Sequence, residues 1–289
     1  MKVLVLGVTG MLGSAVFNEL YKDKTLDVRG TLRSNSMLRY FSNEKHANLH
    51  CNVDVLDNDS LVDLMANVQP EVVINCVGLI KQLADATEPL SVLPINAMLP
   101  HRLSKLCALS NSRLIHISTD CVFNGKKGSY IEEDTSDAED LYGKSKYIGE
   151  VVNQPHVVTL RTSIIGHELN SKASLVDWFL SQEVSVKGYK KAIFSGLTTV
   201  ELAGVIKDYV LPKPNISGLY HVSVDAIDKH SLLSLIAIIY GKEIEIEEDV
   251  SICIDRSLDS SKFRQITGYQ PQSWPKLIQK MYQLNFEGK

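Results

Sequence analysis

The chain has 289 residues, of which 44% are hydrophobic and 22% are charged, and its formal net charge is −4. This composition excludes a disordered chain, which would be poorer in apolar residues and richer in one sign of charge. The balance of 30 Lys and Arg residues against 34 Asp and Glu residues also argues against a nucleic-acid-binding protein, which usually carries a basic surplus.

Cysteines, histidines and apolar runs narrow the class further. The five cysteines are scattered and form no C-x-x-C pair, so we expect reduced thiols in a cytoplasmic protein rather than disulfides or a zinc site. No segment has the ~18–20 uninterrupted apolar residues of a membrane span, so we expect no membrane association. There is no H-x-x-x-H or H-E-x-x-H pattern, and we therefore predict no catalytic metal.

Short runs rich in Val, Ile and Leu alternate with amphipathic stretches along the first part of the chain. The helices predicted there are Met11–Tyr21 and Ser91–Ser110, the second with a kink at Pro100. Such alternation is typical of a doubly wound, parallel α/β sheet of the Rossmann type. The predicted strands are Val3–Gly7, Val28–Leu32, His50–Val55, Val72–Val77, Leu114–Ser118 and Val157–Arg161.

The alternation weakens beyond about residue 165. We therefore expect one domain over residues 1–165 and a smaller second lobe over residues 166–289, with a continuous interface between them because no flexible linker separates the two. The elements predicted in the second lobe are the helices Ser174–Gln182, Thr199–Leu211 and Ser231–Tyr240 and the strand Glu243–Glu247.

A G-x-x-G-x-x-G turn follows the first predicted strand and opens the first helix. Glycines allow a tight turn and a close approach of a pyrophosphate, and the helix N-terminus offers free N–H groups to an anion. The alternative is a structural turn without a ligand, but the strand before it and the helix after it favour a dinucleotide site. The residues predicted to bind the cofactor here are Gly7, Thr9, Gly10, Met11, Leu12 and Gly13.

The end of the second predicted strand determines which dinucleotide this fold prefers. An acidic side chain there favours NADH, whereas an arginine accommodates the 2′-phosphate of NADPH. The chain has Arg33 followed by Ser34, so we predict NADPH, with a solvated loop arginine as the alternative. Asp54 and Val55 follow the third strand and are candidates to bracket the adenine, although a solvated turn is an equal alternative.

Tyr142 and Lys146 lie four residues apart at the start of a predicted helix, hence on one face. A phenol is a poor acid at neutral pH, and a nearby cation stabilises the phenolate by lowering its pKa, which suits carbonyl reduction. The spacing alone is more often a surface pair. However, Ile115–Asp120 ends a buried strand with hydroxyl groups at the edge where α/β sheets bind ligands, which favours a catalytic role.

Together these segments resemble the extended short-chain dehydrogenases/reductases, and within them the branch of dTDP-4-dehydrorhamnose reductase. The resemblance covers nearly the whole chain and implies a catalytic triad of Thr119, Tyr142 and Lys146. It also implies an NADP-binding Rossmann domain, a nucleotide-sugar-binding lobe with segments at about 193–224 returning to that domain, and a homodimer as one option. Further cofactor contacts implied are Cys76, Val77, Gly78 and Asn96.

Two positions depart from the rhamnose-forming enzymes. Cys121 stands where those enzymes usually have a tyrosine, and Ile164 stands where an aromatic residue follows Arg-Thr-Ser. With these departures, Ser174–Leu180 and Val186–Gly196 look like relatives that reduce UDP-linked 2-acetamido-2,6-dideoxy-hexos-4-uloses, so that substrate is favoured. Within Val186–Gly196, Lys190 and its neighbouring lysines are candidates for the diphosphate, or else form a solvated loop, and Arg256 is a candidate nucleotide contact.

The resemblance leaves three alternatives to this function. The first is dTDP-4-dehydrorhamnose reductase itself. The second is a UDP-sugar epimerase or dehydratase that recycles tightly held NAD, against which Arg33 argues. The third is a non-catalytic nucleotide-binding subunit, as in relatives that partner methionine adenosyltransferase, against which the intact triad argues.

Overall fold

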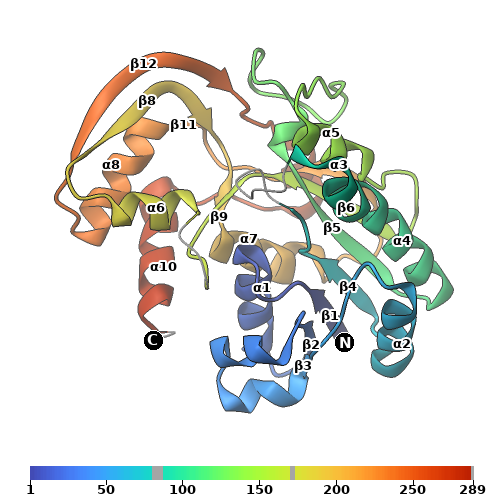
Figure 1. Cartoon of the computed structure of the whole chain (residues 1–289). Coiled ribbons are helices and arrows are strands. Elements are labelled where there is room, and N and C mark those ends of the chain that lie inside the picture. The colour runs from blue at the N-terminus through green and yellow to red at the C-terminus, as the bar shows by residue number, and fades with distance from the viewer. Residues whose placement is uncertain (80–86, 170–172, 288–289) are drawn as a thin grey trace.

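Seven parallel strands form the central sheet. The computed structural model describes residues 1–79, 87–169 and 173–287. In this part of the chain the strand order is β10-β6-β5-β4-β1-β2-β3 (Figure 1). The chain adds β2 and β3 on one side of β1 and then returns to add β4 on the other side of β1. The predicted doubly wound fold is therefore confirmed. The strands are β1 (Lys2–Leu6), β2 (Asp27–Thr31), β3 (Leu49–His50), β4 (Val72–Asn75), β5 (Arg113–Thr119), β6 (Val157–Thr162) and β10 (Gly218–His221).

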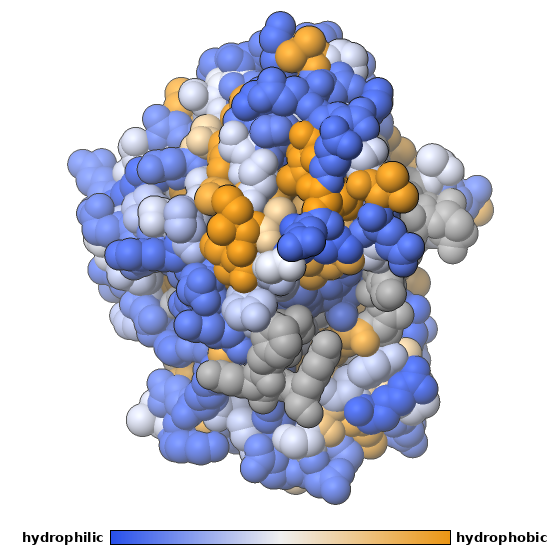
Figure 2. Space-filling view, turned by 90° about the vertical axis from the view of Figure 1, so that its left-hand side faces the viewer, coloured by the Kyte–Doolittle hydropathy of each residue, from blue (hydrophilic) through white to orange (hydrophobic). Residues whose placement is uncertain are grey.

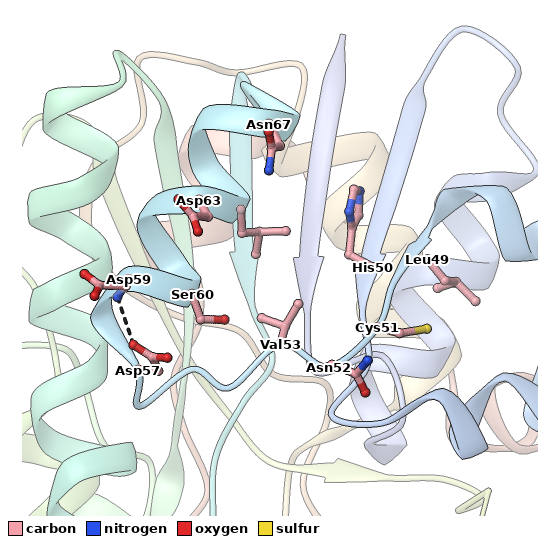
Figure 3. Close-up of a pocket in the computed structure, with 11 residues that line it drawn as sticks. Leu49, His50, Cys51, Asn52, Val53, Asp57, Asp59, Ser60, Asp63 and Asn67 are labelled. Carbon is pink, nitrogen blue, oxygen red and sulfur yellow. Dashed lines mark hydrogen bonds between the residues drawn. The ribbon is translucent and has the colours of Figure 1, made fainter.

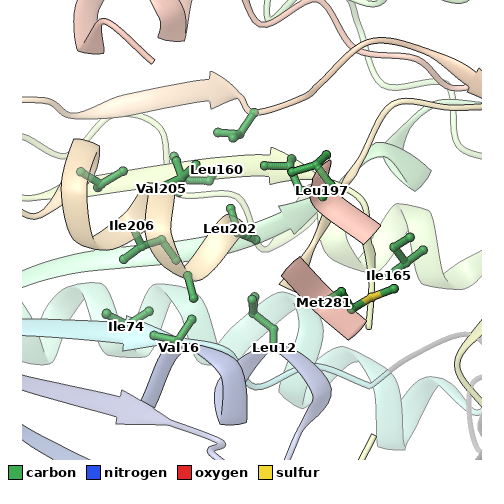
Figure 4. Close-up of a cluster of buried hydrophobic side chains, with 14 of the residues drawn as sticks. Leu12, Val16, Ile74, Leu160, Ile165, Leu197, Leu202, Val205, Ile206 and Met281 are labelled. Atoms are coloured by element: carbon green, nitrogen blue, oxygen red, sulfur yellow. The ribbon is translucent and has the colours of Figure 1, made fainter. Parts of the chain in front are cut away.

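Helices cover both faces of this sheet, because side chains alternate between the faces along each strand. In β1, Val3 and Val5 pack in the core that holds α1 (Met11–Tyr21) and α7 (Thr199–Val205). Leu4 and Leu6 pack in the opposite core with α2 (Asn58–Val68) and α4 (Leu99–Leu109). Figure 4 shows side chains of α1, α7, β4 and β6 meeting in the first core. Each fully buried aliphatic side chain contributes about 1.5–3 kcal/mol to folding.

The third strand is much shorter than predicted. The sequence indicates a strand over His50–Val55, but the chain leaves the sheet after His50. Asn52 adopts a left-handed conformation with φ of 59°, which ends the extended ladder. The backbone N–H of Val53 still donates to the carbonyl of Leu32 at 3.0 Å, so the loop stays against the end of β2.

The predicted helix at Ser91–Ser110 is three consecutive helical segments. They are α3 (Pro89–Val92), the π-helical η4 (Leu93–Met98) and α4. Pro100 lies in the first turn of α4. A proline at that place lacks the N–H that would bond residue 96, and the wider π turn precedes it, so the predicted irregularity takes the form of a π segment rather than a simple kink at Pro100.

The second part of the chain forms a smaller sheet and also contributes to the large one. β8 (Ser185–Phe194) lies between β11 (Ile227–Asp228) and β12 (Glu245–Asp255), and β8 and β12 form a long curved ribbon beside α8 (Lys229–Tyr240) (Figure 1). β10 joins the large sheet next to β6. The remaining elements are α5 (Leu141–Ile148), α6 (Leu175–Ser181), α9 (Ser261–Thr267), α10 (Trp274–Glu287), β7 (Ile164–Ile165), β9 (Leu197–Thr198), η1 (Asn35–Tyr40), η2 (Asn43–Asn48), η5 (Asp120–Val122) and η6 (Ile206–Val210).

Figure 2 shows the side of the molecule on which β8 and β12 lie, and apolar side chains gather mainly in the upper half of that view. Exposed large apolar residues in the second part of the chain include Val184, Ile238 and Val250. Among the described residues, no helix combines the length and the apolar character needed to cross a membrane.

Candidate functional site

The glycine turn lies at the carboxyl end of β1, in the middle of the sheet. Gly7 has φ of +79°, a conformation that side chains disfavour. A Cβ at Gly13 would stand 2.1 Å from the carbonyl oxygen of Gly7, so only glycine lets α1 pack this closely on the turn. α1 has neither a side-chain cap nor an acidic residue in its first turn. Its N-terminus therefore suits an anion.

The other predicted cofactor residues follow the strands beside this turn. Arg33 is exposed directly after β2, and the hydroxyl of Ser34 accepts the N–H of Ser36 and caps η1. Asp54 is exposed and accepts the N–H of Leu56 at 2.9 Å, whereas Val55 is buried in the core with α2. Because Asp54 and Val55 serve a turn and a core, neither side chain is presented as freely as Arg33.

Cys76, Val77 and Gly78 follow β4 and pass close to the glycine turn. A Cβ at Gly7 would stand 2.9 Å from Cγ2 of Val77, so the two loops touch. Cys76 and Val77 are half-buried and Gly78 is exposed. The two predicted cofactor segments thus form one continuous surface at the carboxyl edge of the sheet.

Asn96 connects this surface to the helix of the predicted catalytic pair. Its side-chain oxygen accepts the N–H of Leu79 at 2.9 Å, and its amide group donates to the carbonyl of Leu79 at 3.0 Å and to Oγ of Ser145 at 3.3 Å. Ser145 in turn donates to the carbonyl of Tyr142 at 2.8 Å. Asn96 is 1% exposed, so these contacts make it a residue that positions α5 against the loop after β4.

Thr119, Tyr142 and Lys146 lie together at the end of β5. The hydroxyl group of Thr119 is close enough to the phenol of Tyr142 to favour its ionised form. The ammonium group of Lys146 donates to the carbonyl of Ile117, two residues before Thr119, at 2.7 Å. A Cβ at Gly143 would stand 2.2 Å from the carbonyl oxygen of Cys121, so the glycine beside Tyr142 lets α5 approach the strand end this closely.

Burial shifts the pKa values of the two titrating members in opposite directions. It raises the pKa of Tyr142 above its ordinary value, and the neighbouring acidic groups of Cys121 and Asp120 add to the rise. It lowers the pKa of Lys146 to about 8. The sequence predicts a lowered pKa for Tyr142, but the net shift is upward, because desolvation of the phenol outweighs the contributions that lower this pKa.

A buried ion pair that sequence reasoning missed lies behind Lys146. Arg161 donates two hydrogen bonds of 2.7 Å to the carboxylate of Glu150, and both side chains are 3% exposed. Ser118 donates to the same carboxylate at 2.7 Å. The charge of Glu150 raises the pKa of Lys146 and so opposes the effect of burial. Glu150 follows Lys146 by four residues, a spacing that could have indicated that the Glu150 carboxylate acts on Lys146.

Of the predicted substrate residues, Cys121 and Arg256 lie beside Thr119, whereas Ile164 and Lys190 contact other elements. The guanidinium group of Arg256 donates from Nε to the carbonyl of Phe123 at 2.7 Å and reaches Sγ of Cys121 at 3.9 Å from Nη1, so Arg256 and Cys121 lie beside Thr119. Ile164 is half-buried in β7 and packs on the main core. Lys190 instead forms a 3.4 Å ion pair with Glu248 on the neighbouring strand.

A cavity of about 630 Å³ lies apart from these residues, at the outer edge of the sheet. Figure 3 shows it between β3, the loop after it and α2, with Asp57, Asp59 and Asp63 around it. None of the predicted catalytic residues lines it. Within the ranges that the structure describes, no group of three His, Cys, Asp or Glu side chains is arranged to hold a metal ion.

Comparison with known proteins places the chain in a family. The model described as "RmlD substrate binding domain" matches residues 1–237. The chain belongs to this family. The predicted resemblance to the branch of dTDP-4-dehydrorhamnose reductase is thereby confirmed at the level of the family.

Two curated relatives differ in how much of them the match covers. The beta subunit of methionine adenosyltransferase 2 from Danio rerio is 32% identical over 171 residues, 58% of this chain and 49% of the relative. The chain thus spans about half the length of that relative. A probable low-salt glycan biosynthesis reductase, Agl14 of Haloferax volcanii, is 28% identical over 268 residues, 89% of this chain and 86% of the relative.

A solved structure supports the fold independently. The dTDP-4-dehydrorhamnose reductase of Bacillus anthracis, solved in complex with NADP, superposes with a TM-score of 0.79 at 19% identity, over 98% of this chain and 99% of that chain. At this identity the likeness concerns the fold, and it agrees with the seven-stranded sheet described above.

Proposed function

We propose that the protein reduces the C4 keto group of a nucleotide-linked 4-keto-6-deoxy sugar with NADPH, in the biosynthesis of a deoxysugar for a surface glycan. The observation that carries the proposal is the convergence of Thr119, Tyr142 and Lys146 at one strand end, beside a glycine turn suited to a dinucleotide. The family membership and the similarity to Agl14, named as a glycan biosynthesis reductase, support it.

The residues present fit a dinucleotide. The free N-terminus of α1 and the glycine turn suit its pyrophosphate, and the exposed Arg33 suits a 2′-phosphate. A Cβ at Gly78 would stand 3.5 Å from Asn96 Oδ1 and 4.0 Å from Lys146 Nζ, so the missing side chain leaves space at the catalytic pair. A bound NADPH would supply a hydride to the carbonyl carbon of the substrate.

The chain's own residues then handle the proton. Tyr142 donates its phenolic proton to the oxygen that becomes a hydroxyl, and its raised pKa keeps the phenol protonated at neutral pH. Thr119, beside Tyr142, orients the same oxygen. The ammonium group of Lys146, held at the carbonyl of Ile117, stabilises the negative charge that remains on the phenol.

We infer a UDP-linked 2-acetamido-2,6-dideoxy-hexos-4-ulose as the substrate, ahead of dTDP-4-dehydrorhamnose. Sugars commonly stack on aromatic faces, and the aliphatic Ile164 and the small Cys121 offer none at the two positions that the resemblance associates with the sugar pocket. The cysteine also leaves more room than a tyrosine would, which suits a larger substituent on the sugar.

The decisive experiment is an NADPH oxidation assay with a panel of UDP- and dTDP-linked 4-keto-6-deoxy sugars, with and without the 2-acetamido group. Tyr142→Phe should lower turnover by about 10²- to 10⁴-fold and leave the Kd of NADPH unchanged, because only the proton donor is lost. Tyr147→Phe, an exposed tyrosine on the same helix, is the matched control. Turnover in Tyr142→Phe equal to that of the wild type would contradict the proposed role.

A second candidate function is a non-catalytic regulatory subunit, favoured by the similarity to the beta subunit of methionine adenosyltransferase 2. The same panel separates the two functions. A regulatory subunit would bind NADPH and oxidise it with none of the sugars, whereas an epimerase or dehydratase would convert a sugar without consuming added NADPH.

A further inference from the structure

Lys229 brings an unpaired cation toward the end of β5 from the second part of the chain. It is the first residue of α8, which Asp228 caps by accepting the N–H of Ser231 at 2.9 Å. The side chain is half-buried, and the ionisable groups that act on it are Asp120, Cys121 and Arg256. Within the part of the chain that the structure describes, its ammonium group has no hydrogen bond or ion pair.

The register of the small sheet explains how Lys229 and Arg256 come together. Ile193 of β8 pairs with Asp228 of β11 on one side and with Asp255 of β12 on the other. Lys229 and Arg256 are the residues that follow these two partners. β11 runs antiparallel and β12 parallel to β8, so the chain continues in opposite directions along β8 from Asp228 and Asp255. With neighbouring strands about 5 Å apart and a rise of about 3.3 Å per residue, the backbones of Lys229 and Arg256 lie about 12 Å apart, a separation at which two long side chains can reach one diphosphate.

Arg256 is oriented toward the triad by contacts of its own. Its Nε donates to the carbonyl of Phe123 and its Nη1 reaches Cys121, both in or next to the short helix η5 that begins after Thr119. No carboxylate of the described residues forms an ion pair with it. Further guanidinium N–H groups therefore remain for a ligand.

The charges beside Thr119 do not balance. Lys229 and Arg256 contribute two positive charges, and among the described residues Asp120 is the carboxylate that acts on Lys229. Burial raises the pKa of Asp120, and the carboxylate already accepts a hydrogen bond of 3.1 Å from Thr119. A half-buried ammonium group without an ion pair is unfavourable in the free protein, which points to an anion that arrives with a ligand.

We propose that Lys229, together with Arg256, binds the diphosphate of the nucleotide-linked sugar and so sets the sugar's position at Thr119. This inference rests on the proposed function, because the diphosphate is the strong anion that such a substrate carries. In such a substrate the diphosphate is attached at C1, across the sugar ring from the C4 keto group. The lysines of β8 are less suited, since Lys187 and Lys190 pair with Asp249 and Glu248 at 3.0 and 3.4 Å.

The test is a calorimetric titration of UDP and of dTDP into the protein saturated with NADP⁺. Lys229→Met should raise the Kd of whichever nucleotide the wild type binds by about tenfold or more, the loss typical of a hydrogen bond to a charged group. Lys229→Arg should keep the Kd within a few-fold, because the charge remains. Lys187→Met, which removes an exposed lysine of the same sheet, should leave the Kd unchanged.

Uridine or thymidine, which lack phosphate, distinguish binding from structural damage. Lys229→Met should bind the nucleoside as the wild type does, and an equal loss for nucleoside and nucleotide would overturn the proposal. So would unchanged UDP and dTDP affinity in Lys229→Met, or a wild type that binds neither nucleotide. No sugar is reduced in these titrations, so a failed reductase assay would refute the proposed reaction without affecting this result.

Discussion

The lowered pKa of Lys146 predicts an alkaline limit to activity. Burial brings this pKa from 10.5 to about 8, and the side chain is only 6% exposed. If the ammonium form is the active one, then kcat/KM for NADPH, which reports the free enzyme, should fall about tenfold for each pH unit above 8. Tyr142 should add no limit in this range, because its pKa is raised above the ordinary value.

Stability should move in the opposite direction over the same pH range. Between about 8 and 10.5 the unfolded chain holds a proton on Lys146 that the folded chain has lost, so the unfolded state binds more protons and the free energy of unfolding rises with pH. A shift of this size corresponds to about 3 kcal/mol between the two limits. If activity falls with pH while the free energy of unfolding rises, then the loss of activity comes from titration of Lys146 and not from alkaline unfolding.

Two variants make this prediction specific. Lys146→Arg keeps a charge that does not titrate below pH 12, so the alkaline limb should disappear even where the rate itself is lower. Lys146→Met should remove the rise in the free energy of unfolding, measured by urea denaturation at each pH. Lys144→Met, an exposed lysine on the same helix, should keep both. A kcat/KM that stays constant from pH 7.5 to 10, or a limb that survives in Lys146→Arg, would refute the reasoning.

Three further predictions follow from single contacts. Arg33→Ala should raise the Kd of NADPH about tenfold and leave that of NADH unchanged, as measured by fluorescence titration; equal affinities would contradict the 2′-phosphate role. Gly13→Ala should destabilise the fold by about 1–3 kcal/mol in thermal unfolding, because its Cβ would overlap the Gly7 carbonyl, whereas Gly204→Ala, with no atom closer than 3.7 Å, should not. Arg161→Met should cost about 3–5 kcal/mol, because it leaves the Glu150 carboxylate buried and unpaired; a loss under 1 kcal/mol would show that the pair is not buried in solution.

The central sheet and the triad could be predicted because their signals are local. Each buried strand shows as a short apolar run, and the four-residue spacing of Tyr142 and Lys146 places both on one helix face. Parallel strands end at one edge of a sheet, so a hydroxyl at the end of β5 had to lie near the glycine turn after β1. These arguments need no knowledge of distant contacts.

The features that were missed depend on such contacts. The third strand ends early because Asn52 takes a left-handed conformation, which nothing in its neighbours requires. Asn96 holds Leu79 and Ser145, residues 17 and 49 positions away, and no periodicity indicates that pairing. The position of Lys229 relative to Arg256 depends on the register of three strands in the smaller sheet, which a short β segment in the sequence does not define.

Burial determines how the two titrating groups of the site behave, because it disfavours the charged forms of both Tyr142 and Lys146. It keeps the Tyr142 phenol protonated and able to donate, and it lowers the pKa of Lys146 to about 8, so that its ammonium group loses its proton more easily. A phenolate formed in this environment would be strongly unfavourable by itself. The buried ammonium group of Lys146 is also unfavourable by itself, and a phenolate on Tyr142 would stabilise it. Proton donation by Tyr142 and retention of the proton on Lys146 therefore favour each other. This coupling explains why a reductase would keep both groups buried rather than leave either in water.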